Sequence, residues 1–237
     1  MKKAIPNAIT LANLLAGMLA VVFLVYGQLK VAVGLVLIAL FADFLDGAVA
    51  RWLKVNSPLG KELDSLADVV SFGVAPGVML YGLISAGYSG GAWPSAVDYA
   101  ALPAFLLAPF AALRLGKFNL DERQSEAFIG LPTPASALFV CGLVLLYLKP
   151  HPGWAEVFLH PLALYAVTGL LSALMIAEIP MFSLKMKHFG WAGNEIKYIF
   201  AGISLVLLAL WRETALTAII LLYISLSIGL YLSKRKN

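Results

Sequence analysis

The hydrophobic positions of this chain fall into long apolar segments separated by short polar ones. A helix needs about 20 apolar residues to cross the hydrocarbon core of a bilayer. Reading the chain at that length gives eight predicted spans: 8–27, 30–52, 60–86, 98–118, 132–149, 160–178, 195–212 and 214–233. The third is unusual because its first turns are polar, and the last two are so close that a tight hairpin must join them. The pattern predicts an all-α polytopic transmembrane bundle forming a single domain, residues 1–237.

Composition agrees with this membrane assignment. Hydrophobic residues make up 61% of the chain and charged residues 13%, whereas a soluble domain carries about 25% charged residues. The single cysteine, Cys141, excludes an intrachain disulfide and is predicted to pack within a membrane helix. The start, Met-Lys-Lys before an apolar stretch, is similar to a signal peptide. Because Pro6-Asn7 interrupts that start and no cleavage site precedes a soluble domain, we expect an uncleaved first helix.

The distribution of basic residues predicts the orientation of the bundle. Lysine and arginine accumulate on the cytoplasmic side of membrane proteins. With eight crossings, one side holds fourteen of the 17 basic residues: Lys2, Lys3, Arg51, Lys54, Lys61, Arg114, Lys117, Arg123, Lys185, Lys187, Lys197, Lys234, Arg235 and Lys236. The other side holds Lys30, Lys149 and Arg212. This asymmetry predicts that the protein lies in the cell membrane with its N- and C-termini in the cytoplasm. The net charge of +4 might suggest a nucleic-acid-binding protein, but this distribution of the basic residues argues against that function.

Four aspartates stand close together at the predicted cytoplasmic ends of the second and third spans. They are Asp43, Asp46, Asp64 and Asp68. Carboxylates in membrane-length apolar segments are costly, so a group of four calls for a functional explanation. At roughly 100° per helical residue, Asp43 and Asp46 share one helix face, and Asp64 and Asp68 share another. Two such faces brought together would form a cup of carboxylates.

The residue types indicate a site for hard cations and phosphate. Carboxylates without nearby histidine or cysteine prefer Mg²⁺ or Mn²⁺, and two such ions can clamp a phosphoryl group during in-line displacement. Arg51, Lys54 and Lys61 add positive charge that suits an anionic ligand. Two alternatives remain open: ordinary ion pairs between these cations and the aspartates, and a cation transporter that uses the aspartates as an ion pathway.

The spacing of these residues resembles a known signature. The pattern D-x2-D-G-x2-A-R-x8-G-x3-D-x3-D is filled at every fixed position from Asp43 to Asp68, and it is typical of the CDP-alcohol phosphotransferases. Members of that family displace CMP from a CDP-linked lipid or alcohol and join the remaining group to a hydroxyl acceptor. The resemblance implies a polytopic enzyme with two divalent cations, Mg²⁺ or Mn²⁺, and a homodimer.

The resemblance also implies roles for individual residues. All four aspartates would be metal ligands, and Asp68 would in addition be the catalytic base that takes the proton of the acceptor. The CDP-lipid would be contacted by residues of the signature and of the first helix: Pro6, Asn7, Thr10, Gly47, Arg51, Ser57 and Gly60.

The acceptor is predicted from three further segments, 65–76, 114–119 and 128–134. Together they resemble the membrane-type phosphatidylserine synthases, which implies CDP-diacylglycerol and L-serine as substrates, although that subfamily usually has alanine where Gly116 stands. Arg114 is a candidate for the serine carboxylate, and Asn119 for the carboxylate or the ammonium group. Glycerol 3-phosphate or an inositol phosphate as acceptor, and an archaeal-type CDP-lipid as donor, remain alternatives at this stage.

Overall fold

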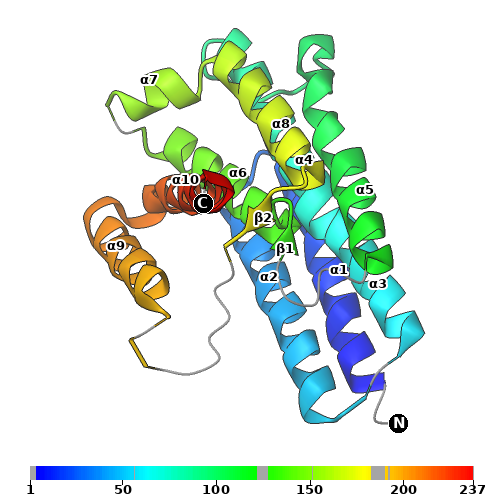
Figure 1. The fold of residues 1–237 in the computed structure, drawn as a ribbon. Coiled ribbons are helices and arrows are strands. Elements are labelled where there is room, and N and C mark those ends of the chain that lie inside the picture. Colours follow the sequence, from blue (N-terminus) through cyan, green and yellow to red (C-terminus); the bar gives the residue numbers. More distant parts are fainter. Residues whose placement is uncertain are drawn as a thin grey trace.

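The computed structural model describes residues 4–55, 57–121, 128–150, 152–182, 190–191 and 193–236. Within them the regular secondary structure is helical apart from one short strand pair (Figure 1). The helices are α1 (Ala4–Val25), α2 (Leu29–Trp52), α3 (Pro58–Asp68), α4 (Ala75–Tyr88), α5 (Leu107–Leu120), α6 (Thr133–Leu148), α7 (Trp154–Phe158), α8 (Pro161–Ile176), α9 (Glu195–Trp211) and α10 (Ala215–Lys236). The strands β1 (Phe128–Ile129) and β2 (Pro180–Met181) pair antiparallel, with Phe128 opposite Met181.

Every predicted span coincides with a helical segment of the described chain. Five of these segments are long and apolar enough to cross a membrane: Ala4–Val25, Leu29–Trp52, Pro58–Tyr88, Tyr99–Leu120 and Ala215–Ser233. Helices α6 and α8 are apolar but shorter. The protein is therefore a helical membrane protein, while the number of eight crossings and the orientation of the termini stay predictions. Of the basic residues used for that orientation, Lys2, Lys3, Arg123, Lys185 and Lys187 lie outside the described residues.

The third span is one long helix with a change of winding in its middle. A π-helical segment, Val69–Val74, follows Asp68 directly and joins α3 to α4. A 3-10 segment, Tyr99–Leu106, similarly leads into α5. π-Helical turns inside α-helices are frequent at functional sites, and this one begins at the residue after the last aspartate of the signature.

Small residues allow the helices around the aspartates to pack closely. A Cβ added to Gly17 of α1 would lie 2.8 Å from the Cα of Ser71 in the π-helical segment. On the other side of that segment, a Cβ on Gly73 would lie 3.0 Å from the Cβ of Ala111 in α5. Close backbone approach through small residues is a general feature of membrane helix packing. The helix that carries Asp64 and Asp68 is thereby held between α1 and α5.

The segment before α6 is tied to the end of α8. The backbone N–H of Gly130 donates to the carbonyl of Ile179 (2.9 Å), and that of Leu131 donates to the carbonyl of Leu174 (2.9 Å). Gly130 has φ +75°, and a Cβ there would clash with the carbonyl oxygen of Met175. Only glycine fits this position without strain, so the contact fixes the end of α8 against the loop that enters α6.

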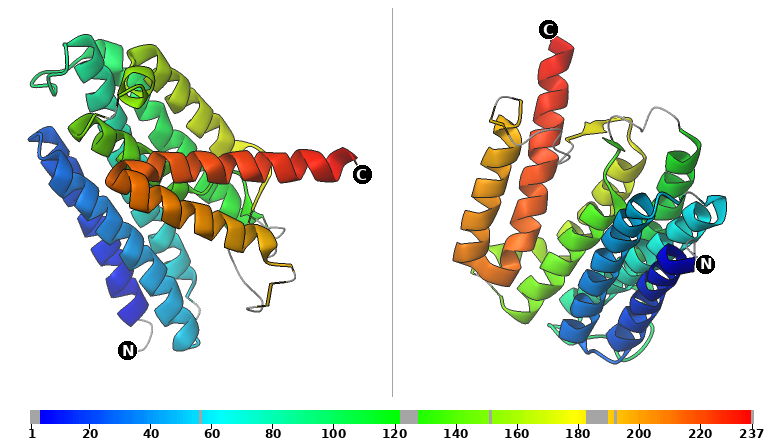
Figure 2. Two further views of the ribbon diagram at one scale, coloured as in Figure 1. Left: turned by 90° about the vertical axis from the view of Figure 1, so that its left-hand side faces the viewer. Right: turned by 90° about the horizontal axis from the view of Figure 1, so that it is seen from below.

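Helices α9 and α10 form a hairpin through the short 3-10 segment Arg212–Thr214. The two views of Figure 2 show that this hairpin runs at a steep angle to the α1–α2 pair and forms a separate layer, with α6 between the two. The contact with α6 is close, because a Cβ on Gly142 would meet the hydroxyl of Thr217. The tight hairpin predicted around residues 212–214 is thus present.

Candidate metal centre and substrate pockets

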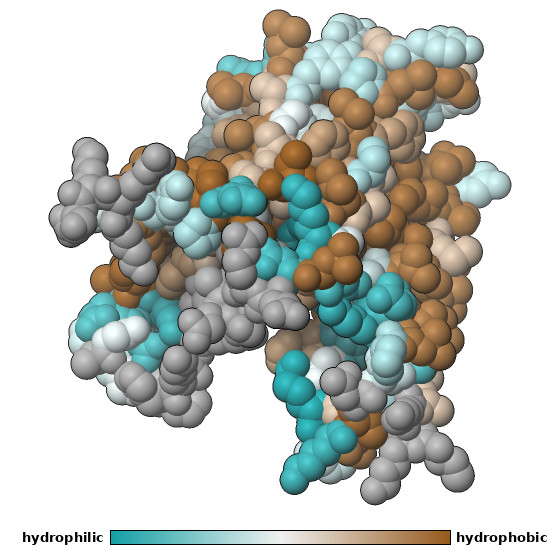
Figure 3. All heavy atoms as spheres, turned by 45° about the vertical axis from the view of Figure 1, so that its right-hand side comes forward, coloured by the Kyte–Doolittle hydropathy of each residue, from teal (hydrophilic) through white to brown (hydrophobic). Residues whose placement is uncertain are grey.

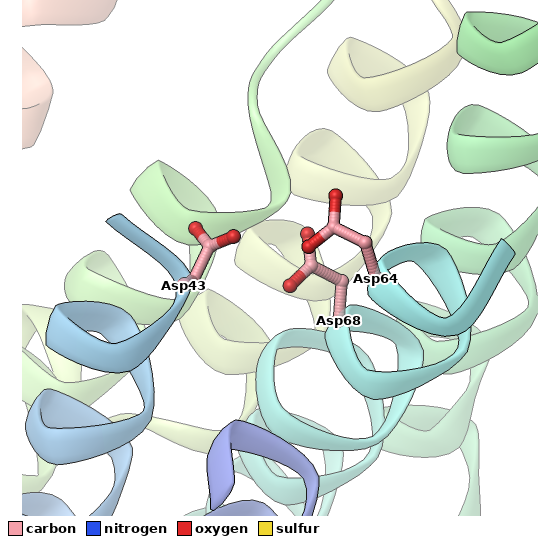
Figure 4. Close-up of side chains that lie close together, drawn as sticks. All are labelled: Asp43, Asp64 and Asp68. Atoms are coloured by element: carbon pink, nitrogen blue, oxygen red, sulfur yellow. The ribbon is translucent and has the colours of Figure 1, made fainter. Parts of the chain in front are cut away.

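Three carboxylates from two helices converge in one cluster. Asp43 comes from α2, while Asp64 and Asp68 stand one turn apart on α3 (Figure 4). Each offers an oxygen, and these oxygens all lie within 4.8 Å of one another. The spacing of the aspartates predicted that two helix faces could bring carboxylates together, and these three side chains meet in that way.

Asp46 lies next to this cluster and faces a different partner. Its Oδ2 is within hydrogen-bond distance of Thr10 Oγ1 on α1, and the same hydroxyl is 3.1 Å from the carbonyl of Pro6. Asp46 still interacts electrostatically with Asp43, Asp64 and Asp68. The structure thus separates a group of three facing carboxylates from a fourth that is bonded to the first helix.

Asp68 has a buried partner on α1 that the sequence analysis did not select. Asn13 Nδ2 donates to Asp68 Oδ1 (3.3 Å), and Ser71 Oγ donates to the backbone carbonyl of Asn13 (3.1 Å). Asn13 is 0% exposed and Asp68 is 6% exposed. The sequence signal that could have identified Asn13 is a polar residue within an apolar span, one turn after Thr10.

The cluster fits a hard divalent cation. Its donor set consists of carboxylate oxygens alone, which is the set that Mg²⁺ and Mn²⁺ prefer. Asp64 Oδ1 is buried and has no hydrogen-bond partner within the described chain, and leaving a buried acceptor unpaired is costly. Lys61, one of the cations considered for ordinary ion pairs, instead donates from Nζ to the carbonyl of Asn119 (2.8 Å). A bound cation would satisfy the unpaired oxygen.

A pocket of about 250 Å³ opens beside the cluster, between the starts of α1 and α3 and the end of α2. It is lined by Pro6, Asn7, Thr10, Asp46, Gly47, Ala50, Val55, Ser57, Gly60, Lys61 and Asp64. Six of the seven residues predicted to contact the CDP-lipid are in this lining. The seventh, Arg51, is exposed and lies next to it, with one guanidinium nitrogen 3.3 Å from the place where a Cβ on Gly47 would stand.

The local structure of this pocket follows from its small and capping residues. Ser57 is the N-cap of α3, where its Oγ accepts from the backbone N–H of Gly60 (3.3 Å), as serine commonly does at helix starts. A Cβ on Gly60 would lie 3.1 Å from Asn7 Oδ1. The glycine therefore keeps the start of α3 close to α1 and leaves the pocket open.

A second pocket, of about 440 Å³, contains Arg114. The Arg114 side chain is 6% exposed, its Nε has no hydrogen-bond partner in the described chain, and it interacts electrostatically with Asp68 and with Tyr223 of α10. The other predicted acceptor residue, Asn119, is not in this lining. Its Nδ2 donates to Ser65 Oγ (2.8 Å), which links α5 to α3. Its predicted contact with the acceptor stays a prediction.

Comparison with known proteins bears on the whole arrangement. A family model described as CDP-alcohol phosphatidyltransferase matches residues 3–169. The chain belongs to this family. The matched residues include α1 to α6, all the aspartates of the signature, the 250 Å³ pocket and the greater part of α8. The signature recognised in the sequence therefore lies within the matched region, and three of its four aspartates form the carboxylate cluster.

Individual relatives carry a more specific name, CDP-diacylglycerol–serine O-phosphatidyltransferase. The chain is 38% identical to the protein of Mycobacterium leprae over 179 residues, which is 75% of this chain and 57% of that protein. It is 40% identical to the Helicobacter pylori J99 protein over 148 residues (62% and 59%). It is 34% identical to the Bacillus subtilis protein over 185 residues (78% and 90%). The match thus spans less than two thirds of the mycobacterial and Helicobacter proteins and nine tenths of the Bacillus one.

Proposed function

We propose that this protein transfers the phosphatidyl group of CDP-diacylglycerol to the hydroxyl of L-serine, giving phosphatidylserine and CMP. The observation that carries the proposal is the cluster of Asp43, Asp64 and Asp68. Asp64 lines the 250 Å³ pocket, and Asp68 interacts electrostatically with the buried Arg114. The names of the matched relatives support serine as the acceptor.

The aspartates would hold Mg²⁺ or Mn²⁺, with Asp43, Asp64 and Asp68 as the facing ligands and Asp46 beside them. When bound, such cations neutralise the pyrophosphate and the charge that develops on the departing CMP. The four carboxylates and the family resemblance both favour two bound cations. The small residues Gly47 and Gly60 leave room for the cytidine diphosphate, and Arg51 and Lys61 offer positive charge to its phosphates.

Asp68 is the proposed base. It takes the proton of the serine hydroxyl as that oxygen forms its bond to the phosphorus attached to diacylglycerol, and the bond from this phosphorus to the CMP oxygen breaks. A positioned base of this kind contributes about 10²- to 10⁴-fold to rate. The Asn13 amide, which donates to Asp68 Oδ1, keeps the carboxylate oriented.

Replacing Asn13 with leucine tests this orienting role. The substitution keeps a similar volume and removes the hydrogen bond to Asp68, so we expect kcat to fall about tenfold with little change in the KM for CDP-diacylglycerol. The matched control is Thr168→Val on α8, because the Thr168 hydroxyl donates to the carbonyl of Leu164 within the same helix. A loss of CDP-lipid affinity equal to the loss in kcat would contradict a role confined to Asp68.

Replacing Gly60 with valine tests the nucleotide pocket. The added side chain enters the 250 Å³ pocket against Asn7, so we expect the KM for CDP-diacylglycerol to rise about tenfold or more, from steric exclusion. Gly169→Val on α8 is the matched control, because a Cβ there meets nothing within 4 Å among the described residues. An unchanged KM in the Gly60 variant would place the nucleotide elsewhere.

The proposal includes the setting of the enzyme. It would be a multi-pass protein of the cytoplasmic membrane with both termini and the active site on the cytoplasmic side, and it would act as a homodimer. The distribution of basic residues supports the orientation, and the family resemblance supports the dimer. Figure 3 shows the most hydrophilic side chains over the middle and lower parts of the face in view, moderately hydrophilic ones also at its top, and hydrophobic ones over much of the rest.

The direct test is an acceptor panel. Purified protein is given CDP-diacylglycerol with serine, glycerol 3-phosphate or an inositol phosphate, and CMP release is measured. We expect CMP to form with serine. Release with glycerol 3-phosphate but not with serine would keep the chemistry and overturn the acceptor. Divalent-cation flux in proteoliposomes without any CMP would point to the transporter alternative.

A further inference from the structure

The 440 Å³ pocket carries side chains of both charges. It lies between the end of α5 and the end of α8, and Arg114 and Lys117 of α5 bring positive charge to its lining. Asp121, which follows α5, and Glu178, which follows α8, bring negative charge to the same lining. A pocket with opposed charges suits a zwitterion, whereas a phosphate dianion would meet repulsion from both carboxylates.

Arg114 connects this pocket to the proposed base. Its side chain lines the pocket, is buried, and interacts electrostatically with Asp68. Its Nε is buried without a hydrogen-bond partner in the described part of the chain. A planar guanidinium with donors to spare is well suited to a carboxylate. A small hydroxy acid bound to Arg114 would keep its hydroxyl in the neighbourhood of Asp68.

The far wall of the pocket comes from outside the matched family region. Met175, Ile176, Ala177 and Glu178 all follow residue 169, where the family model ends. The backbone on both sides of Glu178 is fixed, since the carbonyls of Leu174 and Ile179 accept from Leu131 and Gly130. The backbone thus holds Glu178 at the pocket. Glu178 also lies beyond the region that the family model matches.

We propose that this pocket is the acceptor subsite and that Glu178 determines specificity by pairing with the ammonium group of the amino acid. Arg114 and Lys117 hold the carboxylate of the same molecule. The inference rests on the proposed function and adds the recognition of an α-amino acid as a zwitterion. It assigns the choice of acceptor to the junction of α8 and β2, and the phosphoryl chemistry to α2 and α3.

The test compares serine with glycerate in Glu178→Gln. Glycerate carries a hydroxyl in place of the ammonium group, so it offers no positive charge to Glu178. We expect the KM for serine to rise roughly 10- to 100-fold, the loss for a hydrogen bond to a charged group, with kcat and the KM for CDP-diacylglycerol within about twofold. The Ki of glycerate, measured as a competitor of serine, should stay unchanged or fall. Glu156→Gln, an exposed glutamate on α7, is the matched control.

Three results would overturn the assignment. These are an unchanged serine KM in Glu178→Gln, an equal weakening of serine and glycerate, or a serine effect that appears in Asp121→Asn instead. Failure of the proposed function is a distinct outcome, because the unmodified protein would then release no CMP with serine. The melting temperature of each variant separates a loss of recognition from a loss of folding.

Discussion

The Asp68→Asn variant is expected to lose roughly 10²- to 10⁴-fold in kcat, the range that a positioned base supplies. Asparagine has nearly the same size and cannot take the serine proton. The side chain is 6% exposed and lies among the carboxylates of Asp43 and Asp64, so the packing around it is kept. We therefore expect CDP-diacylglycerol to bind within a few-fold of its normal affinity. Single-turnover CMP release and a separate binding measurement report the two quantities.

The control for this variant is Asp98→Asn at the start of the 3-10 segment before α5. Asp98 caps that segment by accepting from the backbone N–H of Ala100 (3.0 Å), a bond that an asparagine oxygen can also accept. The Asp98→Asn variant should keep full activity. If Asp68→Asn lost metal and lipid binding together with turnover, Asp68 would be primarily a metal ligand. If Asp68→Asn kept an unimpaired kcat, the base role would be excluded.

Removal of divalent metal is expected to abolish CMP release completely, and Mg²⁺ or Mn²⁺ should restore it. The reason is the all-oxygen donor set and the buried Asp64 Oδ1, which has no hydrogen-bond partner among the described residues; both favour a hard cation. In Asp64→Asn we expect the metal concentration that gives half-maximal activity to rise at least about tenfold, because one charged ligand is lost. Activity is titrated against free metal after chelation.

Metal content and activity must be measured on the same sample. The Asp98→Asn control should respond to metal as the unmodified protein does. Full turnover in protein shown by elemental analysis to contain no divalent metal would contradict a metal centre at these aspartates. An Asp64 variant with an unchanged metal titration would move that centre away from the cluster.

Much of the fold follows from the sequence because membrane spans leave a strong local signal. A long apolar run must satisfy its backbone hydrogen bonds within itself, so it becomes a helix wherever it is placed. For the same reason the ends of predicted spans such as 30–52 and 132–149 differ from α2 and α6 by one residue at most. The aspartates were equally visible, because charge within such runs is rare.

The parts that could not be predicted depend on contacts between distant segments. Asn13 reaches Asp68 only when α1 packs against α3, and Glu178 joins the Arg114 pocket only through the ties between the loop before α6 and the end of α8. The π-helical segment after Asp68 has no local signature. The contact between Asn119 and Ser65 of α3 is likewise one that spacing along the chain does not show, and the predicted contact of Asn119 with the acceptor stays a prediction.

The most direct test of the account follows the atoms of the reaction. Purified protein with Mg²⁺ or Mn²⁺ is given CDP-diacylglycerol and serine labelled in its carbon skeleton, and both lipid-bound label and free CMP are counted. The account predicts that label enters the lipid in a one-to-one ratio with CMP, and that the rate of formation of both products falls roughly 10²- to 10⁴-fold in Asp68→Asn. CMP release without label in the lipid, or incorporation at an unreduced rate in the Asp68 variant, would contradict it.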